Sequence, residues 1–157
     1  MAGKCTCVGR AAAARRITED GVNQQERMVE GVVAVVRRDG RFLMIQRAEG
    51  ILAGGAWCFV GGSIEPGEPQ HDAVIREFRE EVGGSVRAIR KVWEVTRGAS
   101  LRLHWWLVEM VDEALEPNPA EVQAIRWCTR DEIIALPNVL ATNLAFLDAV
   151  ADDLLSL

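Results

Sequence analysis

Residues 62–84 read GSIEPGEPQHDAVIREFREEVGG, a glycine-bearing turn followed by a helical pattern. From Pro69 onward, apolar side chains recur at spacings of three and four residues, which predicts a helix with one apolar stripe packed on a sheet. The stripe consists of Val74, Ile75, Phe78 and Val82. Pro69 suits the first helical turn, and the pair Gly83-Gly84 suits the end of the helix.

Three glutamates of this predicted helix fall on one side of it. At about 100° per residue, Glu77, Glu80 and Glu81 lie within an arc of roughly 100° beside the apolar stripe. Crowded like charges destabilise a helix unless a cation neutralises them, and carboxylate oxygens suit Mg²⁺ or Mn²⁺. We therefore expect a divalent metal ion at this helix. In the alternative interpretation, the acids form a solvated face paired with Arg76 and Arg79.

The residues before the helix favour a binding site over a solvated face. A predicted strand ends in Gly61-Gly62, and Glu65 and Glu68 follow in a Pro-Gly turn. A glycine-rich loop allows the backbone to approach a ligand closely. The acids of the helix and the open backbone of the loop would then face the same site.

With this context, the segment resembles the box motif of the Nudix family. Its eight matching positions are Gly62, Glu68, Arg76, Glu77, Phe78, Glu80, Glu81 and Gly83. The last position of the motif departs, with Gly84 where an aliphatic residue is usual, and we expect looser packing after the helix there. The resemblance implies an α/β fold, the Nudix α/β/α sandwich with a mixed β-sheet between helices.

The resemblance also implies a set of metal ligands. Glu80 and Glu81 would be the main ligands of Mg²⁺ or Mn²⁺, with Glu77 as a further ligand or the general base. Glu68 would be a supporting acid, and the carbonyl of Gly61 an additional ligand. The implied reaction is attack of water on a diphosphate linkage, in which the ion polarises phosphoryl oxygens and a glutamate takes the proton.

Two more residues are implied as catalytic partners of this metal site. Arg76 would orient a glutamate. In MutT-type members of the family, a glutamate six residues before a tryptophan completes the metal site or assists the base, and Glu121 stands six residues before Trp127 here. In the alternative interpretation, Glu121 is an ordinary exposed acid of a loop.

Three residues are candidates for binding the substrate. MutT-type enzymes read an oxidised purine partly through an asparagine just before the last helix, which would be Asn143 here; capping of that helix is the alternative. Trp57 could stack on a base, although buried tryptophan is commoner, and Arg47 could contact phosphate or lie at the surface. Alternation along a strand places one member of the pair Trp105-Trp106 in the core.

The resemblance implies an enzyme that hydrolyses a nucleoside triphosphate to a monophosphate and pyrophosphate. Oxidised purine nucleotides such as 8-oxo-dGTP are candidate substrates, so a small nucleotide is the expected partner. The alternatives are another Nudix substrate, such as a nucleotide sugar or an RNA 5′ end, and a non-catalytic nucleotide-sensing module. Such sensors usually lose acids of the box, all of which this chain keeps.

Apolar segments and turn residues predict the rest of the sheet. Residues 31–38 and 41–47 flank Asp39-Gly40, which predicts a hairpin with a type I′ turn. The other predicted strands are 57–60, 86–95, 101–110 and 122–128. Strands mixed with helices in this order indicate a layered α/β domain.

Two helices are predicted after the last strand. Thr129 followed three residues later by Glu132 forms a capping box, which should open a short helix that ends near Pro137. The last 17 or so residues predict a final amphipathic helix, since their apolar side chains recur at helical spacing. Its apolar residues are Leu144, Phe146, Leu147, Val150 and Leu154.

The composition is that of one soluble domain. The chain has 157 residues, of which 49% are hydrophobic and 26% charged, a profile typical of globular proteins. Its net charge of −5 argues against stable nucleic-acid binding. No apolar run approaches the roughly 20 residues that a membrane span needs. We expect a monomer or a homodimer that does not associate with membranes.

Residues 1–27 differ from the rest and are predicted to be an N-terminal tail, with the Nudix domain at 28–157. The tail contains a run of alanines and the pair Cys5 and Cys7, which we interpret as incidental free thiols. The four cysteines of the chain show neither a disulfide framework nor zinc-ligand spacing. This usage indicates a reducing, cytoplasmic setting.

Overall fold

The computed structural model describes residues 27–155 of the chain. The strands are β1 (Val29–Arg38), β2 (Arg41–Arg47), β3 (Trp57–Cys58), β4 (Val60–Ser63), β5 (Val86–Arg97), β6 (Leu101–Met110) and β7 (Val122–Cys128). The helices are α1 (Gln70–Val82), α2 (Arg130–Ala135), α3 (Ala141–Ala149) and α4 (Ala151–Leu155). The predicted tail, with Cys5 and Cys7, lies outside the described residues except for its last position, so the domain boundary stays a prediction.

Strand β1 is the centre of a mixed sheet whose main path runs β3-β2-β1-β6-β5. One edge of β1 pairs in parallel with β6, from Val29 to Val36. The other edge pairs antiparallel with β4 through residues 31–34, and then with β2 through Arg37 and Arg38. Because of this divided edge, β1 joins the glycine-bearing strand β4 to the rest of the sheet.

Asp39 and Gly40 connect β1 to β2 in the predicted turn. Their φ angles are 49° and 71°, and Arg38 pairs with Arg41 on either side of them. Positive φ at both central residues is the signature of a type I′ turn. The predicted hairpin is therefore confirmed.

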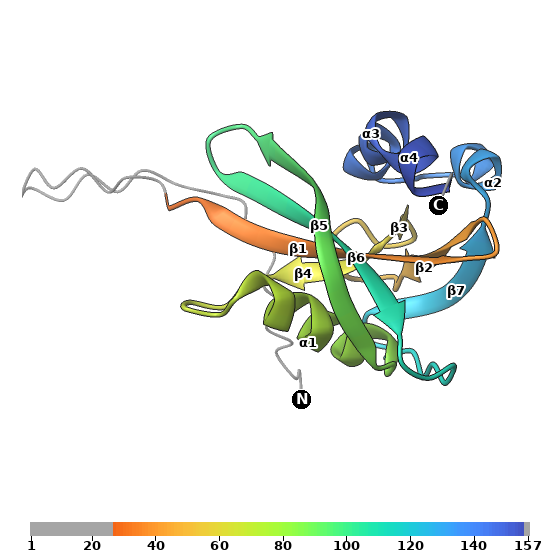
Figure 1. Ribbon diagram of the computed structural model, residues 1–157, viewed down its shortest axis with the longest axis horizontal. Helices are drawn as coiled ribbons and strands as arrows, with labels where there is room; N and C mark the ends of the chain where they lie inside the picture. Colours follow the sequence, from red (N-terminus) through yellow and green to blue (C-terminus); the bar gives the residue numbers. More distant parts are fainter. Residues whose placement is uncertain (1–26, 156–157) are drawn as a thin grey trace, which may run out of the picture.

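Helices cover both faces of the sheet (Figure 1). On one face, α1 buries Ala73, Val74, Phe78 and Val82 against strand residues. On the other face, Phe146 and Leu147 of α3 and Leu154 of α4 pack on a second core. The α/β/α sandwich with a mixed sheet is thus confirmed. In residues 27–155, no helix has the length and apolar character needed to cross a membrane.

Aromatic side chains fill the core beneath α3. The rings of Phe146 and Trp105 stack with their centroids 4.4 Å apart, and Phe59 meets both edge-on at 5.4 and 5.5 Å. Such pairs stabilise a core by about 0.5–1.5 kcal/mol beyond the area they bury. Trp105 is fully buried, whereas Trp106 donates a hydrogen bond from Nε1 to Gln70 in α1 at 3.2 Å. The two tryptophans face opposite sides, so the predicted alternation is confirmed.

Two of the predicted elements differ in the structure. The C-terminal segment forms two helices instead of one, because Val150 leaves the helical conformation with φ at −138°. This break places Leu154 of α4 in the same core as Phe146 of α3. The predicted strand 57–60 is also divided, since β3 pairs with β2 whereas β4 pairs with β1.

Replacement of Phe146 by alanine (Phe146→Ala) should lower the free energy of unfolding by about 3–5 kcal/mol, because removal of a fully buried ring leaves a cavity beside Trp105. Urea unfolding followed by tryptophan fluorescence measures this change. Ile134→Ala is the control, because Ile134 is 50% exposed and its truncation should cost less than about 1 kcal/mol. Equal losses in the two variants would contradict the assigned core.

Candidate active site

Helix α1 ends in two glycines that fit their surroundings closely. Gly83 adopts a φ of 69°, and its N–H donates to the carbonyl of Arg79 at 2.9 Å. Gly84 is buried, and a Cβ at this position would lie 2.7 Å from Phe78 and 2.8 Å from Leu115. The looser packing expected at Gly84 is therefore wrong, because these two side chains close directly over the glycine.

Arg76 connects three glutamates and the end of β4. Its Nε and Nη2 donate to the two carboxylate oxygens of Glu68 at 2.8 and 2.9 Å. Its Nη1 donates to Glu77 at 2.8 Å and to Glu80 at 3.1 Å, and Nη2 also donates to the carbonyl of Ser63 at 2.9 Å. The bond from Arg76 is the main reason why the pKa of Glu68 is lowered. The guanidinium thus fixes the helix against the glycine loop.

Glu81 is buried and Glu77 is half-buried beside the glycine loop. The side chain of Glu77 is 12% exposed, and Glu81 is 5% exposed. A Cβ on Gly62 would lie 2.3 Å from the carboxyl carbon of Glu77. The N–H of Gly61 points to an oxygen of Glu81 at 3.4 Å. Glycine at position 62 is therefore what makes room for the Glu77 carboxylate.

Burial makes both carboxyl groups hard to ionise. It raises the pKa of Glu81 from 4.5 to about 8, and the negative charges of Glu77 and Glu121 add to this rise. Burial also raises the pKa of Glu77, although the hydrogen bond from Arg76 acts against it. Both carboxyl groups therefore favour their protonated form more than an exposed glutamate does.

Glu80 is separate from this buried pair. Its side chain is 54% exposed and bonded to Arg76, as in the solvated-face interpretation. The three acids predicted to gather are thus divided between a buried pair and a surface residue. Within residues 27–155, no three side chains of His, Cys, Asp or Glu form a metal-binding group. The ligand roles of Glu80, Glu81, Glu77, Glu68 and Gly61 stay predictions.

Glu121 lies near the buried pair, since its charge contributes to the raised pKa of both Glu77 and Glu81. Asn118 positions it: the side-chain amide donates to Glu121 Oε1 at 3.3 Å, and the backbone N–H donates to the carbonyl of Glu81 at 2.8 Å. Asn118 was not among the residues predicted from the sequence. Asparagine favours turns in which its side chain bonds to the backbone two residues later, and this preference could have indicated Asn118. In the structure, Oδ1 of Asn118 accepts a hydrogen bond from the N–H of Ala120 at 3.1 Å.

Two predicted substrate-binding residues have different surroundings. Arg47 lies at the end of β2, where its Nε donates to the carbonyl of Leu52 at 2.8 Å. The positive charge of Arg47 acts against the rise in the pKa of Glu81. Trp57 is 8% exposed and packs in the core beneath α3. The structure therefore brings Arg47 toward the carboxylates but places Trp57 in the opposite core.

Asn143 is buried within α3, whose N-cap residue is Leu140. The capping alternative for Asn143 is therefore wrong. Its Oδ1 accepts a hydrogen bond from the N–H of Phe59 at 2.8 Å, and its Nδ2 donates to Thr142 at 3.2 Å. The residue is only 4% exposed. Its carbonyl oxygen thus holds the backbone that leads into β4.

Comparisons with known proteins place this arrangement in a family. The NUDIX domain profile matches residues 27–150. The chain belongs to the Nudix hydrolase family. It is 36% identical over 114 residues to the CTP pyrophosphohydrolase of Escherichia coli. The aligned region covers 71% of this chain and 83% of that protein.

Two further similarities agree with this membership. The chain is 28% identical over 121 residues to the NAD-capped RNA hydrolase NudC of Stutzerimonas stutzeri, which covers 74% of this Nudix chain but 42% of that longer protein. The crystal structure of a MutT Nudix hydrolase from Burkholderia pseudomallei superposes with a TM-score of 0.66 at 26% identity. That superposition covers 78% of this chain and 98% of the other.

The stability of the metal-free Nudix domain should fall as pH rises between about 4.5 and about 8. The unfolded Glu81 carboxyl loses its proton near 4.5, whereas the folded one keeps it to about 8. The contribution of protonated Glu81 to the free energy of unfolding is complete below pH 4.5 and is lost as the pH rises through about 8. The free energy of unfolding should fall by up to about 1.4 kcal/mol per pH unit in this range. Urea unfolding in the presence of a chelator measures the slope.

Two variants test the origin of this slope. Glu81→Gln should flatten it, because the amide does not titrate. Glu113→Gln should leave it unchanged, because the Glu113 side chain is 86% exposed. An unaltered slope in Glu81→Gln would show that another group is responsible.

Proposed function

We propose that this Nudix chain is a metal-dependent pyrophosphohydrolase that converts a nucleoside triphosphate to a monophosphate and pyrophosphate. The main support is the buried carboxyl group of Glu81 and the half-buried one of Glu77, which lie beside the backbone of Gly61 and Gly62. Buried acids without full charge compensation mark functional sites more often than structural ones. The similarity to a protein named as a CTP pyrophosphohydrolase supports the same class of substrate.

The donor groups at this site fit Mg²⁺ or Mn²⁺. Both ions prefer carboxylate and carbonyl oxygens, and the raised pKa of Glu81 marks a place where a cation is electrostatically favoured. Glu81, Glu77 and the carbonyl of Gly61 would hold the ion, with Glu80 and Glu68 as supporting acids. When bound, the ion would polarise phosphoryl oxygens and lower the pKa of a coordinated water.

The chain's own residues would position the reacting groups and move the proton. Glu77 is the proposed general base, since its raised pKa lies closer to neutral pH than that of an exposed glutamate. Glu121, held by Asn118, would assist it or complete the metal site. Arg76 would keep Glu77 oriented through their hydrogen bond. Arg47 would bind a phosphate group of the substrate.

CTP is the first candidate substrate because of the named relative. The second is 8-oxo-dGTP, which is supported by the spacing of Glu121 and Trp127 and by the position of Asn143 in the first turn of α3. Since the Asn143 carbonyl oxygen accepts from Phe59 and one amide N–H donates to Thr142, the remaining amide N–H is the part proposed to meet a base. The burial of Trp57 in the core beneath α3 argues against the stacking role predicted for it.

The proposed setting is the cytoplasm. Cys58 and Cys128 are free and buried thiols in the described part of the chain. Free cysteines are typical of reducing compartments. Nucleotides of the cytoplasm would then be the substrates.

A panel of nucleotides incubated with Mg²⁺ or Mn²⁺ tests the proposal, with products identified by chromatography. We expect monophosphate and pyrophosphate from CTP or 8-oxo-dGTP at the highest kcat/KM. Glu77→Gln should lower kcat about a hundredfold or more, because it removes the proton acceptor. Glu113→Gln, with its 86% exposed side chain, is the matched control and should retain activity.

The alternatives predict different results. Preferred cleavage of a nucleotide sugar or a capped RNA would replace the triphosphate assignment by another Nudix substrate. Nucleotide binding without turnover of any substrate would favour the sensing module. Full activity in Glu77→Gln would overturn the assignment of the base.

A further inference from the structure

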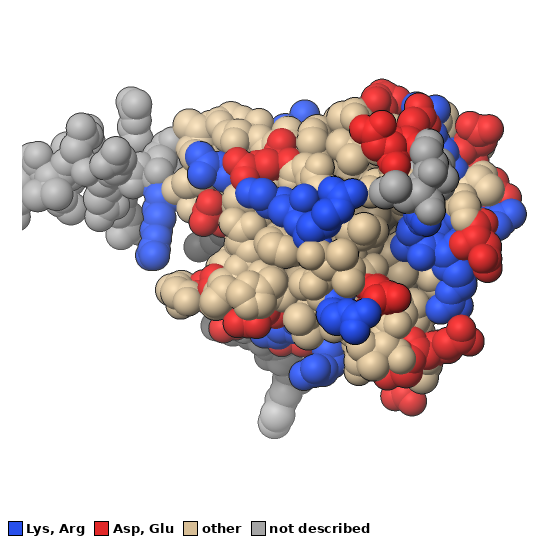
Figure 2. Space-filling model, in the orientation of Figure 1, with Lys and Arg blue, Asp and Glu red and all other residues tan. Residues whose placement is uncertain are grey.

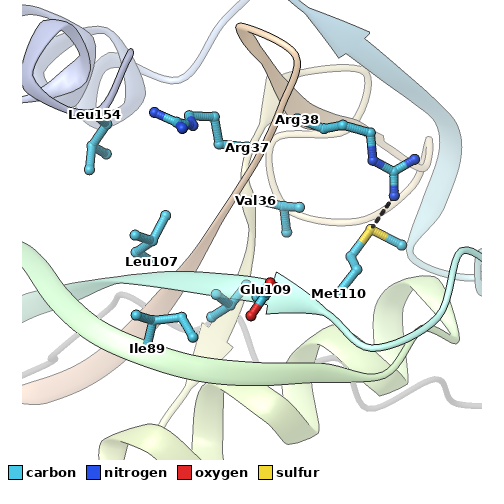
Figure 3. A pocket seen from close by; sticks show the side chains of 9 residues that line it. Val36, Arg37, Arg38, Ile89, Leu107, Glu109, Met110 and Leu154 are labelled. Atoms are coloured by element: carbon cyan, nitrogen blue, oxygen red, sulfur yellow. Dashed lines mark hydrogen bonds between the residues drawn. The ribbon is translucent and has the colours of Figure 1, made fainter. Parts of the chain in front are cut away.

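A pocket lies where the parallel strands β1 and β6 separate (Figure 3). Their pairing ends at Val36 and Val108. Beyond this point β1 pairs with β2, whereas β6 stays paired with β5. The carboxyl ends of the two strands therefore diverge, and in open α/β sheets such divergence leaves a crevice that binds ligands.

The walls of this pocket are mainly aliphatic. Its volume of about 440 Å³ lies within the range of about 300–1,000 Å³ that is usual for small-molecule sites. The apolar lining consists of Val36, Ile89, Leu107, Val108, Met110 and Leu154. Ile89 is 46% exposed, so an apolar surface remains open to a ligand at the pocket.

The charged residues of the pocket leave one cation available. Glu109 lines the pocket, but its carboxylate is bonded to Arg87. Arg38 extends toward Met110 and lies 4.8 Å over the ring of Trp127. Arg37 is half-buried, and no acceptor within residues 27–155 lies at hydrogen-bond or ion-pair distance from its guanidinium. A partly buried guanidinium without a partner favours an anionic ligand.

Basic side chains also lie on the neighbouring edge strand β5, and Figure 2 shows basic side chains across the face that β5 crosses. Two of them are paired with acids, Arg87 with Glu109 and Lys91 with Glu94. Charged side chains on β5 oppose pairing of this edge with a second copy of the chain. The preference of the pocket for an anion therefore rests on Arg37.

We propose that this pocket binds a small amphiphilic anion, in which a carboxylate or phosphate headgroup carries a short aliphatic chain. The headgroup pairs with Arg37, and the chain packs on Leu107, Ile89 and Leu154. This site is separate from the carboxylates of α1, so it does not depend on the proposed hydrolysis.

Titration of the ¹⁵N-labelled full chain with octanoate, followed by NMR, tests this proposal. Octyl phosphate distinguishes the two headgroups, octanol lacks the charge, and acetate lacks the chain. We expect saturable shifts at residues 36–38 and 107–110 for octanoate, octyl phosphate or both, with much weaker binding of octanol and acetate. Arg37→Gln should weaken binding about tenfold or more, because it removes a charge-assisted hydrogen bond.

Arg97→Gln is the matched control, because Arg97 is an exposed residue at the other end of β5. It should bind octanoate as the wild type does. Unchanged spectra of Arg37→Gln away from the pocket show that this variant is folded. The proposal is overturned by an absence of saturable shifts, by shifts centred elsewhere, by octanol or acetate binding equally well, or by equal affinity in Arg37→Gln.

Discussion

Burial of two carboxyl groups on one helix is the constraint on which the rest of this structure depends. Glu81 is buried and Glu77 half-buried against a glycine backbone, and among residues 27–155 only Arg76 forms an ion pair with either of them, namely with Glu77. Desolvation of an acid opposes its ionisation, and a second nearby acid increases this effect. The fold maintains the arrangement although it opposes stability, which is typical of a site built for a ligand of opposite charge.

Several elements are arranged to keep these carboxyl groups in place. β1 binds β4 along one edge and thereby fixes Gly61 and Gly62 opposite α1. Arg76 secures the helix to the end of β4 through Ser63, and Asn143 fixes the preceding backbone from the opposite layer. The loop before β7 contributes Glu121 from a third direction. The site is therefore assembled from segments far apart in the chain, on a rigid central strand.

Local sequence patterns were sufficient for most of the elements and for recognising the residues of the box motif. The spacing of Phe78 and Val82 gave the buried face of α1, and Asp39-Gly40 gave the hairpin, because both signals depend on neighbouring residues alone. The bond from Phe59 to Asn143 joins residues 84 positions apart, and no local pattern reports such a partner. The break at Val150 follows from packing on a core formed by other segments, so helical periodicity could not reveal it.

Proton release on metal binding tests most directly whether the buried pair is a cation site. Calorimetric titration of the full chain with Mg²⁺ at pH 7, in two buffers of different ionisation enthalpy, measures it. We predict that the ion binds and displaces a proton, because the pKa of Glu81 is about 8 in the metal-free protein and the ligand must be ionised. The release should disappear well above this pH, and Glu81→Gln should bind the ion more weakly. Binding without proton release, equal binding by Glu81→Gln, or no binding of Mg²⁺ or Mn²⁺ would contradict the account.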